Sequence, residues 1–247
     1  MLAHFLAPHP RFGRVNNRLP VGHQQRSPYY WWWACLRRNA DYLACCAAGG
    51  TGALAALYAD FGDVREDNFH RWWSEHERGR MLFAEQPLSV KFAELGSAKE
   101  WSEQWTAQDV MVVAVPLRVS KRSLTGAFAR LLNARHTGKQ GRPALAQQQS
   151  TARYPVARNY TVANLRIALA VYDLWAANQN RSADQQLTLW QMGCELNLNK
   201  QAARDAVSTH KADRAVGRNV LAATVSRHVR QARLLIAGTA EGVFPAA

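Results

Sequence analysis

Long hydrophobic runs and paired cysteines are both missing from this 247-residue sequence. No stretch of about eighteen apolar residues occurs, so we expect no membrane span and no membrane partner. The opening MLAHFLAP has no basic start and no sustained apolar segment, which argues against a signal peptide. The four cysteines form no CxxC pair and have no histidine at zinc-finger spacing. These absences predict a cytoplasmic protein with free thiols, without a metal and without a cofactor.

Acidic residues are scarce outside the middle of the chain. Residues 1–40 hold six basic residues and no acidic ones, and residues 110–247 hold nineteen basic against six acidic residues. Residues 41–109 reverse this balance, with six basic and twelve acidic residues, so the net charge of +13 hides a strong asymmetry. A basic carboxyl-terminal half is typical of a protein that binds nucleic acid. A soluble, arginine-rich surface without such a partner is the alternative.

The segment 188–207, TLWQMGCELNLNKQAARDAV, has the spacing of two short helices joined by a sharp turn. Met192 and Leu196, four residues apart, are expected on the inward side of the first helix. Gly193 is expected to leave room for the second helix to cross close against the first. Asn197 lies where the chain reverses, because asparagine tolerates positive φ better than other non-glycine residues. Asn199 is then the predicted N-cap of the second helix.

The second helix is predicted to turn polar and cationic side chains outward. Such residue types contact phosphates and base edges in the major groove. The candidate DNA-binding residues of this segment are Asn199, Lys200, Gln201, Arg204 and Ser208. The segment resembles the helix-turn-helix of bacterial transcription regulators over about twenty residues. Two helices joined in this way also pack in proteins that never contact DNA, and that alternative stays open.

The first twenty-seven residues carry prolines and arginines without apolar periodicity, which predicts a disordered basic arm. A helix is expected to begin at Pro28, with Ser27 as its N-cap. Trp31, Trp32 and Trp33 follow in direct succession, and successive helical residues diverge by about 100°. At least one of these rings is therefore expected to be partly exposed or to meet another segment.

The segment WWWACLRRNADY resembles the amino-terminal signature of a transcriptional-regulator-like domain family of proteobacteria and their mobile elements. That signature is an aromatic residue, then LRRN, then an acidic and an aromatic residue. The matching residues are Trp33, Leu36, Arg37, Arg38, Asn39, Asp41 and Tyr42. The likeness continues through FGDV, NFHRWW and RMLFAEQP, as far as Pro87. It implies a regulatory role and supplies no catalytic residues.

A strand is predicted over 110–119, VMVVAVPLRV, because the run is rich in β-branched residues. Segments 80–84 and 87–92 are weaker strand candidates. A helix is predicted over 123–136, with Ser120 as an N-cap. The glycine- and glutamine-rich segment 137–158 is a predicted basic linker. Its GRP sequence resembles part of an AT-hook, which makes Arg142 a candidate for contact with the minor groove.

Two longer helices are predicted around the helix-turn-helix, over 161–178 and 213–238. The second carries Arg218, Arg227 and Arg230 as further candidate DNA-binding residues. Its segment 224–229, TVSRHV, resembles the recognition helix of the lac-repressor family. This segment is therefore either a second helix that faces DNA or a source of arginines that clamp phosphates. A solvated helix with surface arginines is the plain alternative.

These patterns predict a mainly α protein with a small β element. We expect an α+β amino-terminal domain over 28–136 and an all-α helix-turn-helix domain over 159–247, joined by the linker. The expected function is a DNA-binding transcriptional regulator of a bacterial mobile element, associated with the nucleoid and not an enzyme. Its expected partner is double-stranded DNA, together with a second copy or another protein bound through the aromatic domain.

Two alternatives remain at the level of sequence. The chain could be an interaction module whose exposed tryptophans bind another protein. It could also be a DNA-processing enzyme, a recombinase or a nickase, with Tyr160 as nucleophile and Arg158 and Arg166 as phosphate clamps. Against the enzyme, no HxxR precedes the tyrosine, and no acidic cluster in the basic half would hold magnesium.

Overall fold

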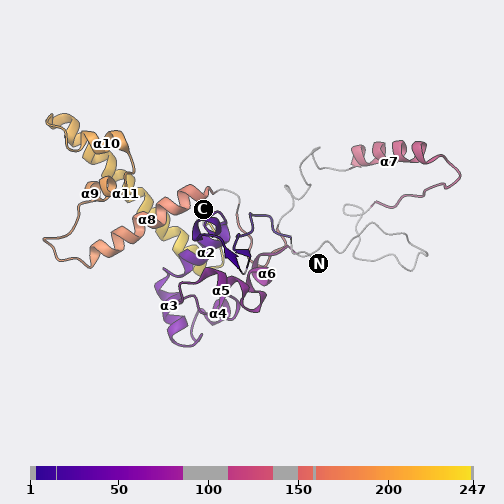
Figure 1. Cartoon of the computed structure of the whole chain (residues 1–247), viewed down its shortest axis with the longest axis horizontal. Coiled ribbons are helices and arrows are strands. Elements are labelled where there is room, and N and C mark those ends of the chain that lie inside the picture. The colour runs from indigo at the N-terminus through magenta and orange to yellow at the C-terminus, as the bar shows by residue number, and fades with distance from the viewer. Residues whose placement is uncertain (1–3, 15, 86–110, 136–149, 158–159, 246–247) are drawn as a thin grey trace. The chain divides into compact units, whose positions relative to one another are not determined.

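The computed structural model describes residues 4–14, 16–85, 111–135, 150–157 and 160–245 (Figure 1). The chain is mainly α with a small β element, as the sequence predicts. Residues 4–84 and 152–245 form one compact unit, called unit 1 below, and residues 85–151 belong to a second, called unit 2. The predicted division into domains at 28–136 and 159–247 differs from this, because unit 1 takes residues from both ends of the chain.

The first part of unit 1 consists of a short hairpin and a series of short helices. In the hairpin, Gly13 pairs with Arg18 and Arg14 with Asn17 in antiparallel register. The elements are β1 (Gly13–Arg14), β2 (Asn17–Arg18), α1 (Val21–Gln24), α2 (Pro28–Leu36), α3 (Ala40–Ala47), α4 (Ala55–Phe61), α5 (Phe69–Ser74), the 3-10 helix η1 (Glu75–Glu77) and α6 (Arg78–Phe83).

Side-chain caps explain where several of these helices begin. The Ser27 hydroxyl accepts a hydrogen bond from the backbone N–H of Tyr29 at 3.3 Å, with proline at the first position of α2, as predicted. Asn39 caps α3 in the same way, accepting from the backbone N–H of Tyr42 at 2.9 Å. Each cap satisfies a backbone donor that the first turn of a helix leaves unpaired.

Aromatic rings packed around α2 form the main core of unit 1, called the aromatic core below. Trp31, Trp32 and Trp33 are all buried, so of the two expected outcomes, a partly exposed ring or contact with another segment, the second is found. Trp31 Nε1 donates to the Gln25 carbonyl at 2.8 Å, and the Trp32 ring stacks on Phe61 at 5.8 Å between centroids. Segments on every side of α2 therefore cover its divergent rings.

Residues 4–27 do not behave as the predicted disordered arm. Phe5 lies 5.9 Å from the rings of Tyr29 and Trp73, and Phe12 lies 5.8 Å from Phe69, measured between centroids. Two isolated phenylalanines carry no helical or strand period, so the pattern gives no sign of order. Each is nevertheless half-buried against the aromatic core, and this burial offsets part of the entropy of ordering the segment.

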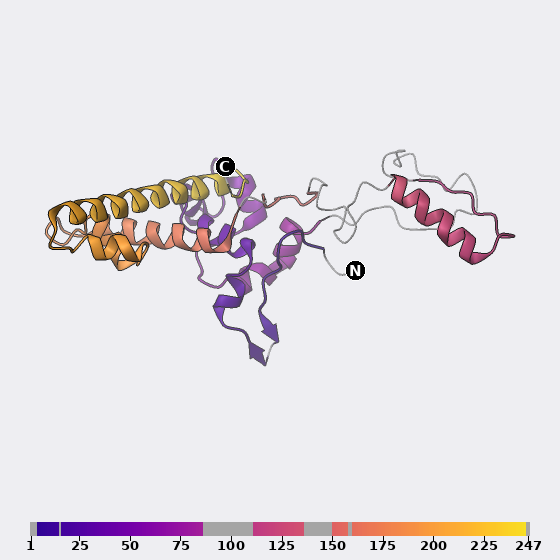
Figure 2. The same ribbon diagram turned by 90° about the horizontal axis from the view of Figure 1, so that it is seen from above.

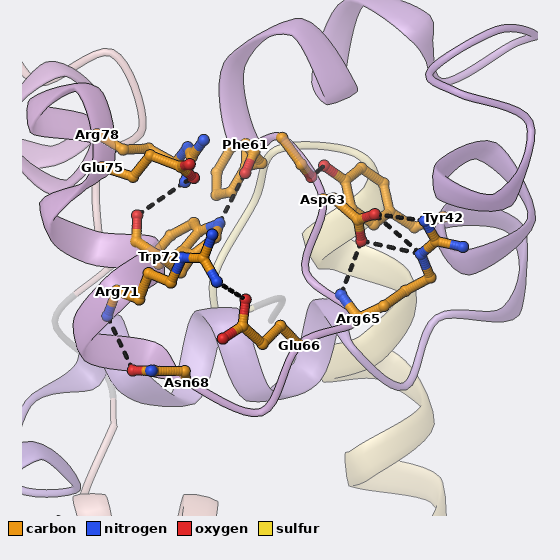
Figure 3. A network of polar contacts seen from close by, with 11 residues as sticks. Tyr42, Phe61, Asp63, Arg65, Glu66, Asn68, Arg71, Trp72, Glu75 and Arg78 are labelled. Atoms are coloured by element: carbon orange, nitrogen blue, oxygen red, sulfur yellow. Dashed lines mark hydrogen bonds and ion pairs between the residues drawn. The ribbon is translucent and has the colours of Figure 1, made fainter.

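Several acidic residues in the described part of 41–109 pair with arginines of the same segment. Figure 3 shows Arg65 on Asp63 and Arg71 on Glu66, the latter at 2.8 Å. Arg78 reaches Glu75 at 3.1 Å and the Trp72 carbonyl at 2.8 Å. These ion pairs lie at the surface and each contributes little stability. Their consequence is electrostatic, because each neutralises one carboxylate within the segment that carries it.

The predicted strands do not form in the described residues. Segment 80–84 falls largely within helix α6, and residues 111–119 form no ladder with a partner. Residues 87–92 and Val110 lie outside the described residues. In α6, a Cβ built on Gly79 would lie 2.1 Å from the Trp73 ring, so a close helix–ring contact decides the structure there. The β-branched run over 111–119 lacks the pairing that would make it a strand.

The carboxyl-terminal part of unit 1 contains α8 (Val162–Gln179), α9 (Leu189–Glu195), α10 (Lys200–Asp205) and α11 (Lys211–Ala240). Helices α8 and α11 run side by side, and both pack on α2 (Figure 2). Arg38, at the end of α2, makes two hydrogen bonds of 2.6 Å to the Asp173 carboxylate of α8. The ring of Phe244 lies 5.4 Å from that of Trp32. Both ends of the chain therefore share the aromatic core.

The described end of the predicted linker also belongs to unit 1. The Tyr154 hydroxyl donates to Asp60 at 2.6 Å, and the Tyr154 N–H donates to the Leu82 carbonyl at 3.0 Å. Val156 forms a parallel bridge with Phe244. Residues 152–157 are thus structural, and the linker interpretation fails for them. The earlier part of the predicted linker, residues 137–149, lies outside the described residues.

Unit 2 contains helix α7 (Lys121–Arg135), which confirms the predicted helix and begins two residues earlier. The Ser120 hydroxyl accepts from the backbone N–H of Ser123 at 3.3 Å, as expected of an N-cap. Where the described parts of unit 2 begin and end, Glu85 accepts hydrogen bonds from the Ser150 hydroxyl at 2.6 Å and from the Thr151 N–H at 2.6 Å.

None of the described helices is long and apolar enough to cross a membrane.

Candidate nucleic-acid interface

The predicted helix-turn-helix is present as α9, a turn and α10. Asn197 has φ of 48°, the left-handed conformation predicted for the point where the chain reverses. The backbone N–H of Leu198 donates to the Gly193 carbonyl at 3.1 Å, which closes the end of α9. Asn199 caps α10 by accepting from the backbone N–H of Ala202 at 3.0 Å. The local backbone chemistry of this turn therefore follows from its two asparagines.

The start of α9 is held to the end of α8 by a buried amide. The Asn178 side chain accepts from the Leu187 N–H at 2.8 Å and donates to the Leu187 carbonyl at 3.0 Å. Gln191 then reaches back to the N–H of Thr188 at 2.7 Å, which completes a capping box. Met192 is buried beneath these contacts, as predicted. The first helix is thus anchored before the turn begins.

Two glycines allow the helices to approach closely, and the structure corrects the role of one of them. A Cβ on Gly193 would lie 3.0 Å from the Leu221 side chain, so this glycine makes room for α11 and not for α10. Gly217 of α11 provides the contact with α10. A Cβ there would lie 2.4 Å from the Ala206 nitrogen and 2.6 Å from the Ala202 carbonyl oxygen. Helix α10 therefore rests on α11 nearly backbone to backbone.

Helix α10 presents its polar side chains to solvent. Lys200, Gln201 and Arg204 are exposed, whereas Ala202 and Ala206 are buried toward α11. Within the part of the chain that the structure describes, neither Lys200 nor Arg204 makes an ion pair. Gln201 donates to Asp205 at 2.8 Å, which fixes its amide but leaves its oxygen available. The helix therefore carries two unneutralised cations on its solvent side.

Three of the predicted residues have structural contacts of their own. Arg218 donates to the Ala206 carbonyl at 3.2 Å, and its guanidinium lies 4.4 Å from the centre of the Trp190 ring. This half-buried arginine therefore holds the end of α10 and the α9 ring against α11. Ser208 is half-buried and accepts from the backbone N–H of His210 at 3.1 Å. The side-chain oxygen of Asn199 accepts the capping hydrogen bond from the Ala202 N–H.

The segment that resembles a lac-repressor recognition helix lies in the middle of α11, without a turn before it. Val225 and Val229 from this segment are buried against α8 and α9, so it forms part of the scaffold. Arg227 and Arg230 point to solvent and remain candidates for phosphate contact only. Arg142 lies outside the described residues. The structure therefore gathers the exposed candidates on α10 and on the outer side of α11.

His228, beside Arg227 on α11, is the titratable group with a clear effect on this scaffold. Burial lowers its pKa from 6.5, and the positive charge of Arg227 lowers it further. The unfolded chain therefore binds the proton more tightly than the folded one, and stability declines as the pH falls through about 6.5.

We expect His228→Gln to reduce the loss of unfolding free energy between about pH 7.5 and about pH 5.5, measured by urea denaturation at both pH values. Exposed His210→Gln serves as the matched control and is expected to leave that loss unchanged. Equal pH dependence in the wild type and in His228→Gln would contradict this account of the scaffold.

The structure describes two of the three residues proposed for an enzyme, Tyr160 and Arg166. Tyr160 is half-buried against the aromatic core, and burial raises the pKa of its hydroxyl, whereas a nucleophile needs a lowered one. Arg158 lies outside the described residues. Among the residues that the structure describes, no group of three or more histidine, cysteine or acidic side chains is placed to hold a metal ion.

Comparison of the chain with family models, with curated proteins and with solved structures gives no match. The arrangement of α9, α10 and α11 is therefore the only basis on which we assign a role to this surface.

Proposed function

We propose that this protein is a DNA-binding transcriptional regulator that places α10 in the major groove of double-stranded DNA. The observation that carries the proposal is the exposure of Lys200 and Arg204 on the second helix of a helix-turn-helix, without an acidic partner among the described residues. A helix of this kind fits the width of the groove. The exposed cations supply the charge that a polyanion attracts.

The two cations differ in the contact that each is suited to make. Lys200 is the first residue of α10 and acts as a point charge toward a phosphate. Arg204, one turn further, has the planar fork that recognises two acceptors of guanine at once. Arg227 and Arg230 add phosphate contacts from α11. Binding by two copies on half-sites about 34–36 Å apart is the arrangement expected of such regulators.

The aromatic core supports the regulator proposal over the interaction module. The tryptophans offered as a partner surface, Trp31 to Trp33, are buried, so in the described residues they present no aromatic platform. The proposal that the regulator belongs to a bacterial mobile element and acts at the nucleoid rests on the amino-terminal resemblance described above.

Arg204→Ala should reduce the preference among DNA sequences more than it reduces overall binding. The bound sequence is first selected from a random duplex library, and affinities for it and for a scrambled duplex are then measured by fluorescence anisotropy. Loss of a bidentate contact to a base removes about 1–3 kcal/mol of discrimination. Arg166→Ala, an exposed arginine of α8, is the matched control and should keep the preference.

Two results would overturn the proposal. One is the absence of duplex binding by the wild type at low salt, where the attraction between cations and phosphates is greatest. The other is an equal fall in affinity for the selected and the scrambled duplex in Arg204→Ala.

A further inference from the structure

The longest stretch of sequence with positive charge and no acidic residue lies before the helix-turn-helix in the chain. Residues 110–160 contain nine basic residues and no acidic one. In the described part of this stretch, Arg153 pairs with Asp60 at 2.7 Å and is thereby neutralised. Five other cations are exposed and make no ion pair with any described residue. They are Arg118, Lys121, Arg122, Arg130 and Arg135.

Four of these five cations are carried by α7, and they surround it. Successive helical residues are separated by about 100°, so Arg122 and Arg130 lie on one side while Lys121 and Arg135 lie on the other. The fifteen residues of α7 contain no acidic side chain and no buried one. A helix with cations on both sides has a high positive charge density in whichever direction it turns.

Exposed aliphatic side chains raise the question of a lipid partner. Leu131 and Leu132 are 42% and 37% exposed, and basic amphipathic helices bind anionic membranes through such residues. On the helical projection, however, Lys121 and Arg135 lie between or beside these leucines and Leu124. Insertion would therefore carry two charges toward the acyl chains. The distribution of charge favours a hydrated polyanion over a bilayer.

We propose that residues 118–135 form a second contact with duplex DNA, made to phosphates and independent of base sequence. This inference rests on the proposed function, because it gives the same DNA a second point of attachment. Two contacts in one chain strengthen each other, since binding of the first raises the effective concentration of the second. Helix α10 would then select the sequence, and α7 would supply affinity and salt dependence.

The test uses the full chain with Arg118, Lys121, Arg122, Arg130 and Arg135 all changed to Gln, and a duplex of random sequence. Each phosphate contact contributes about 0.9 to the slope of log affinity against log salt concentration. We expect the slope to flatten by about 3 or more and the affinity at low salt to fall at least tenfold, measured by fluorescence anisotropy. The preference for the selected sequence should persist, because Arg204 is unchanged.

A matched variant controls for net charge. Arg65, Arg71 and Arg80 are exposed but paired with Asp63, Glu66 and Glu77, so their replacement by Gln should leave the slope unchanged. A further variant, in which only Arg118, Lys121 and Arg122 are changed to Gln, removes the same number of positive charges as this control and is compared with it directly. Circular dichroism of each variant is used to check that it folds. Helix α7 has no buried side chain, so we expect the substitutions on it to leave its structure intact.

The outcomes separate this inference from the proposed function. If the slope of the α7 variant equals that of the wild type while Arg204→Ala still loses sequence preference, α7 is no DNA contact and the regulator proposal stands. If the wild type binds DNA without any sequence preference and the α7 variant loses that binding, the second contact stands and the regulator fails. Sedimentation with phosphatidylglycerol vesicles, lost in the α7 variant with DNA binding unchanged, would overturn the inference in favour of lipid.

Discussion

Replacing Gly217 with alanine is expected to separate α10 from α11 and to abolish sequence-specific DNA binding. The added Cβ would lie within 2.4–2.8 Å of three backbone atoms of α10, and backbone cannot move aside as a flexible side chain does. Overpacking of this kind costs about 1–3 kcal/mol or more, which exceeds the gain of about 1 kcal/mol from replacing glycine in a helix. Urea denaturation should show a net loss of up to about 2 kcal/mol in unfolding free energy.

Gly126→Ala is the matched control for this substitution. Gly126 also lies inside a long helix, α7, but a Cβ there meets nothing within 4 Å. The intrinsic preference of helices for alanine is therefore expressed without a clash, and sequence preference for DNA should be unaffected. Equal stability and equal DNA preference in the two variants would show that α10 does not rest on Gly217.

Replacing Trp32 with alanine should destabilise the helix-turn-helix together with the aromatic core. Trp32 is fully buried and packs with Phe61, Phe83 and Phe244, so its loss leaves a large cavity that costs about 3–5 kcal/mol. Leu165 of α8 and Leu235 of α11 belong to the same cluster of buried residues. We therefore expect one cooperative unfolding transition, shifted as a whole in the variant.

The measurement combines urea denaturation followed by tryptophan fluorescence with hydrogen exchange of the α9 and α10 amides. Trp32→Phe keeps an aromatic ring in the site and should cost much less than the alanine variant. The buried residues of α9 and α10 form clusters of their own with α8 and α11, so these two long helices are the route by which the change would reach them. Unchanged exchange rates of the α9 and α10 amides in Trp32→Ala would contradict this coupling and support the domain boundaries suggested by the sequence.

The turn of the helix-turn-helix could be predicted because it depends on local chemistry. Asn197 adopts positive φ, and Asn199 caps the next helix, through preferences that belong to the residue type. The cap at Ser27 and the helix over 121–135 follow for the same reason. In these places, contacts within a few residues decide the backbone conformation, so the sequence alone predicts it.

The errors concern contacts between distant segments. Phe5 and Phe12 are ordered because their rings pack against Trp73 and Phe69, which lie far away in the sequence. The role of Gly193 was assigned to the wrong helix, since nothing in the local pattern shows that Leu221 lies above it. The sequence likewise gives no sign that the Arg218 guanidinium lies over Trp190, a structural contact additional to any role in DNA binding. In the same way, the strand expected over 110–119 needed a partner that no described residue supplies.

Glu85 accepts hydrogen bonds from Ser150 and Thr151, so these two points of the chain, far apart in sequence, lie side by side. The chain leaves the aromatic core after Phe83 and returns to it at Tyr154, whose backbone N–H donates to the Leu82 carbonyl at 3.0 Å. The two chain positions that bound the intervening sequence are therefore adjacent, so an insertion or deletion between them need not reroute the polypeptide of unit 1.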